Sequence, residues 1–275
     1  MDVGAVLLAN GSVRIKRTRH GLMAYNVNDL YVGRSFDCYG EFSRGETLLF
    51  EQAVAPQSLV VDVGANIGAH TLSLAQAVGR YGLVFAIEPQ RAVFELLCAN
   101  LALNEIGNVR AIHAGAGRTR EQAFMPAHDY SKPGNFGGVE LTGTFGEPVD
   151  VITIDSLNLP ACHFIKIDVE GQEQSVIAGA VETITRFRPT LYVENDRRQR
   201  SAELIRQLRD LDYQLYWHLP PLFRADNFFQ NPINVFADTV SIDMLCLPGG
   251  DQRKIVGMRP VTGPDDWPLA EPTAY

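Results

Sequence analysis

Short apolar runs alternate with stretches of helical spacing from Ser58 onwards, and this alternation constrains the fold more than any other feature of the chain. It is typical of βαβ units, whose strands lie parallel in one sheet. The last two runs follow one another without a helix between them, so they should pair antiparallel. The sequence therefore predicts an α/β fold with seven main strands, at 58–63, 83–88, 109–113, 163–169, 190–194, 213–219 and 240–247.

Composition divides the chain into three parts. Residues 58–247 hold the alternating pattern and are predicted to form one domain, interrupted at 115–148 by a glycine- and proline-rich insertion that is irregular or a small β structure. Residues 1–57 have β character and a turn at Gly45–Glu46, which predicts a β-rich lid or edge segment. Residues 248–275 are rich in Pro, Gly and Asp and are predicted to be a loosely ordered tail.

The charge balance narrows the classes of partner. The 275 residues contain 24 Lys and Arg against 32 Asp and Glu, a formal net charge of −8. This disfavours a surface for nucleic acid or for anionic membranes. The apolar runs are too short to span a membrane, and the basic residues near the N-terminus follow the apolar patch, the reverse of a secretory signal. We expect a cytoplasmic protein whose four cysteines, which lack metal-ligand spacing, are reduced.

A glycine turn at the end of the first predicted strand indicates a ligand site. DVGANIGAH at 62–70 leads from the strand directly into a helix, which is where α/β sheets bind nucleotides. A dinucleotide fingerprint needs a glycine in place of Asn66, and no Lys-Ser/Thr follows Gly68 to hold a phosphate. Glu88 ends the second strand, where a carboxylate can accept hydrogen bonds from ribose hydroxyls. S-adenosylmethionine, which has a ribose but no pyrophosphate, meets this description.

Plainer interpretations of the turn stay open. Gly64 and Gly68 are also typical of a tight strand-to-helix turn that binds nothing, and Glu88 of a solvated strand end. His70, inside the turn, is more often a packing or capping residue than a base. The combination of the two glycines with Asp62 and Glu88 favours the ligand site.

Charges in the strand FIKIDVEG at 164–171 mark a second candidate site. Central parallel strands are normally apolar on both faces, because helices cover both. Here Lys166, Asp168 and Glu170 alternate with apolar residues and fall on one face or at its exit. Buried charges are costly unless they are paired or used in function, so the cluster is a catalytic candidate. An ion pair of Lys166 with Asp168 or Glu170 that only holds the strand end is the alternative.

Polar residues that follow the next strand could complete a metal site. The run TLYVEND at 190–196 ends in the polar residues Glu194, Asn195 and Asp196. Strand ends of a parallel sheet meet at one edge, so Glu194 and Asn195 could converge with Asp168. Three oxygen ligands of this kind suit Mg²⁺. The sequence thus offers Asp168, Glu194 and Asn195 as candidate metal ligands.

Several motifs together resemble the FkbM family of S-adenosylmethionine-dependent methyltransferases. The resemblance spans roughly residues 36–247 and is most specific in its DVGANIG and IKIDVEG motifs. It implies the class I methyltransferase Rossmann-like fold, with sheet order 3-2-1-4-5-7-6 and strand 7 antiparallel. It also implies O-methyl transfer, often to a sugar or polyketide hydroxyl. The motifs that carry it are FDCYGEFSRGE (36–46), VVDVGANIGAHTL (60–72), AIEPQ (86–90), GNFGGVEL (134–141), FIKIDVEGQE (164–173) and PTLYVEND (189–196).

The resemblance also assigns residues to the cofactor. Glu88 would hold the ribose, and His113 and Ala114, after the third strand, would lie beside the adenine. The residues that would line the amino-acid and ribose part are Asp62, Gly64, Ala65, Asn66 and Gly68.

For the transfer itself, we expect the acceptor hydroxyl to attack the methyl group in line, while the protein positions it and removes its proton. Asp168 is the first candidate for base or metal ligand, with Lys166 and Glu170 tuning its charge. The aromatic segment 217–232 should open at the same sheet edge and bind the acceptor, unless its rings only pack the loop. Its candidate residues are Trp217, Phe223, Asn227 and Phe228.

The favoured function is O-methyl transfer from S-adenosylmethionine to a small molecule or glycan. A non-catalytic S-adenosylmethionine-binding module is the first alternative, which the charged strand disfavours. A dinucleotide-dependent oxidoreductase is the second, and Asn66 argues against it. We expect no nucleic-acid partner and no membrane span, and we leave a homo-oligomer open.

Overall fold

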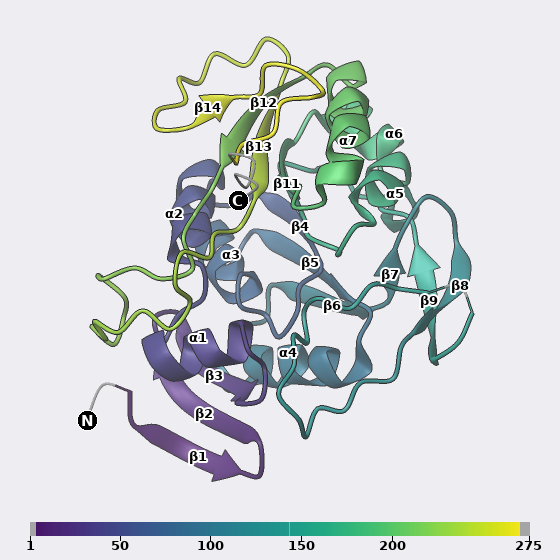
Figure 1. Ribbon diagram of the computed structural model, residues 1–275. Helices are drawn as coiled ribbons and strands as arrows, with labels where there is room; N and C mark the ends of the chain where they lie inside the picture. Colours follow the sequence, from purple (N-terminus) through teal and green to yellow (C-terminus); the bar gives the residue numbers. More distant parts are fainter. Residues whose placement is uncertain (1–3, 143, 270–275) are drawn as a thin grey trace, which may run out of the picture.

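The computed structural model describes residues 4–142 and 144–269 and centres on one large mixed sheet (Figure 1). The order of its eight strands is β14-β12-β13-β11-β10-β4-β5-β6. In chain order the strands are β4 (Leu59–Val63), β5 (Leu83–Glu88), β6 (Val109–His113), β10 (Phe164–Ile167), β11 (Thr190–Glu194), β12 (Tyr213–His218), β13 (Asp243–Pro248) and β14 (Arg259–Pro260).

The five strands from β6 to β11 run parallel, and β13 is antiparallel to both of its neighbours, β11 and β12. The seven predicted strands are all present, and the C-terminal tail adds an eighth, β14, which pairs antiparallel with β12. The backbone amide of Val261 continues this pairing to Leu215, and the Val261 side chain is buried. The tail is therefore ordered at this point, and its residues 270–275 lie outside the described part of the chain.

Alternation along the strands sends side chains to two cores. Val61, Val63, Ile165 and Ile167 pack on one face with apolar residues of α5 (Glu173–Ala178), α6 (Val181–Phe187) and α7 (Arg198–Asp210). Val60, Val84, Phe164 and Tyr192 lie on the other face, against α2 (Arg44–Ala53) and α3 (Thr71–Val78). A third cluster joins α4 (Arg91–Leu103) to the N-terminal segment. Helices thus cover both faces, which explains the apolar strands.

The N-terminal segment is only partly β structure. Its strands β1 (Val6–Asn10), β2 (Val13–Thr18) and β3 (Gly21–Asn26) form an antiparallel sheet, and α1 (Val32–Tyr39) and α2 follow. The predicted turn at Gly45–Glu46 is wrong, because both residues lie in the first turn of α2. The buried residues Thr47, Phe50 and Val54 recur at helical spacing there and bring α2 onto the large sheet.

The predicted insertion forms a small separate sheet. Its strands are β7 (Gly115–Ala116), β8 (Glu121–Met125) and β9 (Glu147–Ile152), in the order β7-β9-β8. A single turn of 3-10 helix, η1 (Asp155–Leu157), leads from it towards β10. Among the residues described, every helix is too short or too polar to cross a membrane.

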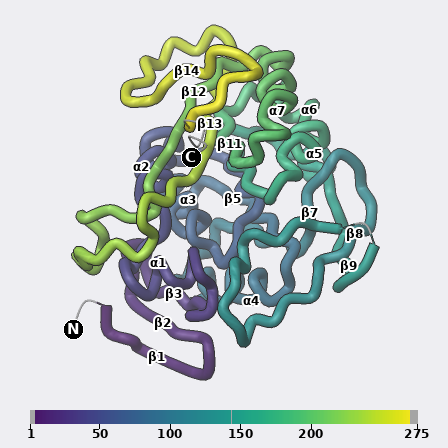
Figure 2. The backbone as a smooth tube through the Cα atoms, in the orientation of Figure 1, coloured from purple at the N-terminus to yellow at the C-terminus, as the bar shows by residue number. Residues whose placement is uncertain are grey.

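Residues 219–242, between β12 and β13, lie against α1, as the tube in Figure 2 shows. The Tyr39 hydroxyl donates to the Ile233 carbonyl at 2.9 Å, and the Phe229 amide donates to the Tyr39 carbonyl at 3.1 Å. We call residues 219–242 the roof, and together with the N-terminal segment they lie beside the carboxyl ends of the parallel strands.

Candidate active site

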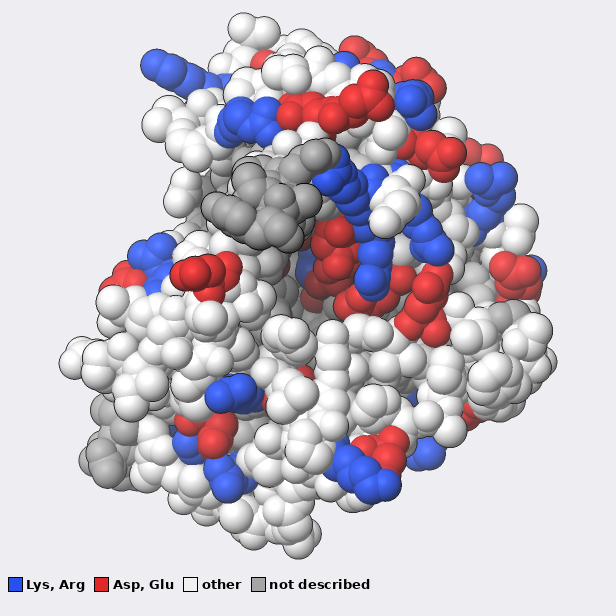
Figure 3. Space-filling model, in the orientation of Figure 1, with Lys and Arg blue, Asp and Glu red and all other residues white. Residues whose placement is uncertain are grey.

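A cavity of about 500 Å³ opens at the carboxyl ends of β4, β5, β10 and β11. Tyr31, Val32 and Phe42 of the N-terminal segment line it from one direction, and Leu222 and Ser241 of the roof from another. Figure 3 shows a hollow on this face where acidic side chains gather, with basic side chains on its rim. Ligands of α/β sheets bind at such an edge, so this cavity is the candidate active site.

The glycine-turn side of the cavity, defined by Gly64, Ala65, Asn66 and Glu88, follows β4 and β5. Gly64 has φ +77°, and a Cβ built on it would lie 1.7 Å from the backbone carbonyl oxygen of Asp168. Any side chain here would collide with the end of β10, so the close approach of the two strand ends requires glycine. Asn66 also has a positive φ, of 51°, and its Oδ1 accepts a hydrogen bond from the Ile67 amide at 2.7 Å.

Glu88 is held by the backbone of this side. Its carboxylate accepts hydrogen bonds from the amides of Asn66 at 2.9 Å and Gln90 at 2.8 Å, and the residue is only 4% exposed. Burial raises the pKa of Glu88 to about 7, although the two amides act in the opposite direction. Glu88 is therefore buried in the cavity wall and not a solvated strand end.

Lys166 links the two halves of the cavity. The residue is buried, and its Nζ lies 3.4 Å from Asp62 Oδ1 and 3.3 Å from Asp168 Oδ2 and donates to the Gly64 carbonyl at 3.0 Å. Burial opposes its charge, but Asp168 and Asp62 raise the pKa of Lys166 above its ordinary value. The ion pair of Lys166 with Asp168 is thus present, and Asp62 below the cavity is part of the same network.

The carboxylate side of the cavity is defined by Asp168, Glu170, Glu194 and Asp243. Carboxylate oxygens of Asp168, Glu170 and Glu194 all lie within 4.8 Å of one another. Burial and then the neighbouring Asp168 raise the pKa of Glu170 to about 8, which Arg197 partly offsets. Burial and the same neighbour raise the pKa of Glu194, while burial and Glu46 raise that of Asp243. Several acidic groups therefore lie close together on this side of the cavity.

The predicted metal set changes at one position. Asn195 is buried outside the cavity, and its Nδ2 donates to Ser201 Oγ at 2.9 Å at the start of α7, so Glu170 takes its place in the cluster. Oxygen donors suit a hard divalent cation. Lys166 and Arg197 already contact Asp168 and Glu170, however, so the cluster is partly neutralised without one.

Several buried polar atoms around the cavity make no hydrogen bond within the described residues. They are Asp62 Oδ1, both ring nitrogens of His70, Glu194 Oε2 and Asp243 Oδ2. Buried polar groups are normally satisfied, so such a group of atoms at one cavity indicates a site built for a polar ligand.

The cavity also contains polar residues that the sequence analysis did not assign. His70 Nε2 lies 3.1 Å from Glu46 Oε2, and both side chains are buried in the cavity wall. Asp243 begins β13 and faces Glu194 across the ladder. The sequence did contain a signal for Asp243, because this residue is a charged side chain within the apolar run VSIDMLCL. Lys166 is a charged side chain within an apolar strand in the same way.

The structure does not bring the predicted acceptor residues to the cavity. Trp217 is 2% exposed and its ring contacts Trp267, because its position on β12 points it towards the C-terminal tail. Phe223 packs on Tyr39, and Phe228 lies beside Phe229 and Arg19. The interpretation of these aromatic rings as loop packing therefore describes them better.

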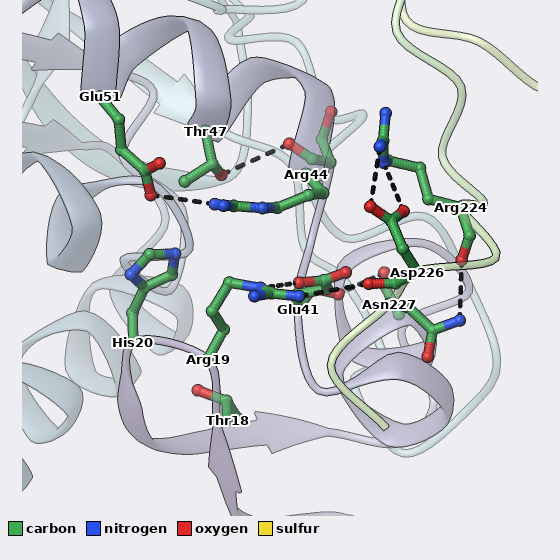
Figure 4. Close-up of polar contacts among 12 residues, drawn as sticks. Thr18, Arg19, His20, Glu41, Arg44, Thr47, Glu51, Arg224, Asp226 and Asn227 are labelled. Atoms are coloured by element: carbon green, nitrogen blue, oxygen red, sulfur yellow. Dashed lines mark hydrogen bonds and ion pairs between the residues drawn. The ribbon is translucent and has the colours of Figure 1, made fainter. Parts of the chain in front are cut away.

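Asn227 belongs to a polar cluster between the roof and the N-terminal segment, drawn in Figure 4. Its side chain donates to the carbonyls of Arg224 at 2.8 Å and Asn231 at 2.7 Å. Asp226 pairs with Arg224, and Glu41 pairs with Arg19 nearby. Asn227 thus fixes the roof and does not line the cavity.

The residues predicted to contact the cofactor lie at different depths. Gly64, Ala65, Asn66, Glu88 and Ala114 line the cavity. Asp62 and Gly68 support the turn from below, with Asp62 accepting a hydrogen bond from the Thr71 hydroxyl at 2.7 Å. His113 turns away, contacts the Pro89 carbonyl at 3.0 Å and stacks on Phe94.

Comparison with known proteins relates this chain to a family of methyltransferases. Residues 62–215 match the family described as the methyltransferase FkbM domain. A protein named Methyltransferase 1 from Beauveria bassiana (strain ARSEF 2860) is 29% identical over 154 residues. The aligned part covers 46% of this chain and 61% of that protein, so the chain spans less than two thirds of its relative.

Solved structures show more distant likenesses. An FkbM methyltransferase from Methylobacillus flagellatus KT has a TM-score of 0.46 and 20% identity, covering 73% of this chain and 50% of that chain. A precorrin-6y C5,15-methyltransferase from Geobacter metallireducens GS-15 has a TM-score of 0.49 and 11% identity, covering 74% and 87%. The family match is the stronger finding, because it spans more than half of the chain and includes both the glycine turn and the charged strand. The chain therefore belongs to the FkbM methyltransferase family.

Proposed function

We propose that this protein is an S-adenosylmethionine-dependent O-methyltransferase. The observation that carries the proposal is the presence of the glycine turn and the buried Glu88 carboxylate in one wall of the cavity. A carboxylate at the end of the second strand can accept hydrogen bonds from both ribose hydroxyls. The family to which the chain belongs supports a methyl donor of this kind.

The residues present fit this cofactor. The close backbone approach at Gly64 and the buried carboxylate of Glu88 are features of a site for a polar ligand. Gly64 and Ala65 would hold the amino-acid part, Glu88 the ribose, and Ala114 the adenine. When bound, S-adenosylmethionine supplies a methyl group on a sulfonium, which a hydroxyl can attack without a metal ion.

We propose that the acceptor binds on the carboxylate side. Asp168 is the most accessible of these carboxylates, with its side chain 38% exposed, and it is the candidate to accept a hydrogen bond from the reacting hydroxyl. Lys166 would hold Asp168 in place, and Glu170 is fixed by Arg197. Several acidic groups at one wall suit an acceptor with many hydroxyl donors, such as a sugar or a polyketide-type alcohol.

Calorimetric titration tests the cofactor first. We expect micromolar binding of S-adenosylmethionine and S-adenosylhomocysteine, much weaker binding in Glu88→Ala, and no binding of NAD⁺, with and without Mg²⁺. Binding of NAD⁺ alone, or of none of the three, would contradict the assignment.

Methyl transfer tests the activity. We expect radiolabelled methyl transfer from S-adenosylmethionine to members of a panel of glycosides and polyketide alcohols. Asp168→Ala should abolish it while cofactor affinity stays within a few-fold. Transfer near the wild-type rate in this variant would exclude Asp168, and cofactor binding with no transfer to any hydroxyl would favour a non-catalytic module.

A further inference from the structure

A buried carboxylate–imidazole pair in the cavity wall is the feature that the proposed function leaves unused. Glu46 lies in the first turn of α2 and His70 directly precedes α3. His70 Nε2 is 3.1 Å from Glu46 Oε2, and each side chain is about 5% exposed. The two residues therefore meet across two helices at the cavity that would hold the cofactor.

Both members of the pair are held in place. Glu46 Oε1 accepts a hydrogen bond from Ser43 Oγ at 2.5 Å. The imidazole lies between two aromatic rings, with centroid distances of 5.6 Å to Phe42 and 5.2 Å to Phe50. A carboxylate that is fixed on one side and contacts one ring nitrogen can orient the imidazole, as the aspartate of a catalytic triad does.

The second ring nitrogen distinguishes this pair from a structural contact. Both ring nitrogens of His70 are buried and make no hydrogen bond with the described residues, but Nε2 has the ion-pair contact with Glu46 whereas Nδ1 has no contact of this kind. A histidine that only joins two helices normally satisfies both nitrogens when it is buried. An unpartnered imidazole nitrogen in the wall of a reaction cavity is instead a free acceptor.

The charges around the pair keep Glu46 ionised. Burial acts to raise its pKa, but His70, the Ser43 hydroxyl and Lys166 of β10 hold the pKa of Glu46 at about 2. The other titratable groups that interact with Glu46 are Tyr192 of β11, His218 of β12 and Asp243 of β13. A permanent negative charge beside Nε2 favours a proton on that nitrogen and leaves Nδ1 with its lone pair.

We propose that the Glu46–His70 pair is the proton acceptor of the methyl transfer, which rests on the proposed O-methyltransferase function. The acceptor O–H bond breaks and its proton passes to His70 Nδ1, while the new O–C bond forms and the S–C bond breaks. The products are a methyl ether, neutral S-adenosylhomocysteine and an imidazolium beside Glu46, which then releases its proton to water. Asp168, whose charge Lys166 already compensates, orients the hydroxyl and is not required to take the proton.

¹⁵N NMR tests which ring nitrogen of His70 carries the proton, and it needs no methyl acceptor. The protein has 6 histidines, so the His70 ring signals can be assigned by their loss in His70→Gln. In ¹⁵N-histidine-labelled protein with S-adenosylhomocysteine, we expect Nε2 of His70 to carry the proton and Nδ1 to be bare. A proton on Nδ1 of the neutral ring would overturn the proposal, because that nitrogen could then accept nothing.

Kinetics test the chemical role. His70→Gln, which keeps the size and polarity of the side chain, should lower kcat about a hundredfold while KM for S-adenosylmethionine stays within about threefold. The remaining activity should rise with pH, because hydroxide replaces the lost base, and Glu46→Gln should show the same pattern more weakly. His20→Gln is the matched control, since His20 lies on the β2–β3 turn beside Glu51 and Arg44 and does not line the cavity (Figure 4).

The outcomes separate the two proposals. Failure to bind S-adenosylhomocysteine would remove the proposed function, whereas the NMR experiment still reads the tautomer of His70. Normal binding together with an unchanged kcat in His70→Gln would overturn only the role of the pair. A rise in KM with no change in kcat would assign His70 to cofactor binding and equally overturn it.

Discussion

The two sides of the cavity are built on different principles. On the glycine-turn side, the single carboxylate Glu88 is already held by two backbone amides, and Gly64 lets the strand ends approach closely. On the carboxylate side, Glu194 and Asp243 each have a buried oxygen atom that makes no hydrogen bond with the described residues. One side is complete before a ligand arrives, and the other needs a ligand, water or proton to satisfy it. This difference fits the proposal that the cofactor binds to the first side and the acceptor to the second.

Substitution of Lys166 should have the largest effect on stability, because this residue contacts acidic groups of both sides of the cavity. Lys166→Met should lower the free energy of unfolding by about 3–5 kcal/mol, since it leaves Asp62 charged and buried without its partner. Chemical denaturation measures this effect. The double variant Lys166→Met with Asp62→Asn should recover part of the loss, and a single variant as stable as the wild type would show that the network is dispensable.

Glu88 tests whether the glycine-turn side serves the cofactor. Glu88→Ala should weaken S-adenosylhomocysteine binding about a hundredfold, because the ribose loses two charge-assisted hydrogen bonds. Calorimetry measures the affinity. Glu194→Gln, on the opposite side, is the control and should change it less than threefold; equal losses in both variants would contradict the division of the cavity.

The same carboxylate predicts a pH dependence. Since the pKa of Glu88 is raised to about 7, the carboxyl is mostly protonated at pH 6 and mostly ionised at pH 8. Ribose hydroxyls need the ionised acceptor, so S-adenosylhomocysteine affinity should fall about tenfold from pH 8 to pH 6. Calorimetry at several pH values tests this. A flat profile, or tighter binding at pH 6, would show that Glu88 does not hold the ribose as an anion.

Asn227 should have the smallest effect, because it lies outside both sides. Asn227→Ala removes three hydrogen bonds within the roof and should lower the free energy of unfolding by about 1 kcal/mol. Affinity for S-adenosylhomocysteine should stay within twofold. A large loss of methyl transfer without a loss of stability would restore Asn227 to the acceptor site.

The sequence predicts the glycine-turn side well because its signals are local. Gly64, Asn66 and Glu88 follow their strands within a few residues, and strand ends of a parallel sheet share one edge. The unusual charges of Lys166 and Asp168 also indicate their site from one short segment. Both the fold class and this half of the cavity follow from such local patterns.

The acceptor half depends on geometry that the sequence does not contain. Trp217 and His218 are neighbours on β12 that point to opposite faces, and the apolar pattern does not say which face reaches the cavity. Asn195 points to the start of α7 because Ser201 satisfies its amide there. Glu46 lies in the first turn of α2, where the neighbouring Gly45 makes the sequence look like a turn between strands. Its contact with His70 therefore cannot be predicted from the sequence.

The antiparallel return of β13 has a consequence for protein engineering. Residues 219–242 leave the sheet after His218 and re-enter it at Asp243, and these two residues are partners in the β12–β13 ladder. The segment is therefore a loop whose two ends are anchored side by side, and Pro221 and Val240 extend the anchor by one bridge. Loops of other lengths from related enzymes can be grafted onto these anchors without changing the strand order. If they keep the contacts to Tyr39, such grafts would test whether the roof determines the acceptor while the proposed cofactor site stays unchanged.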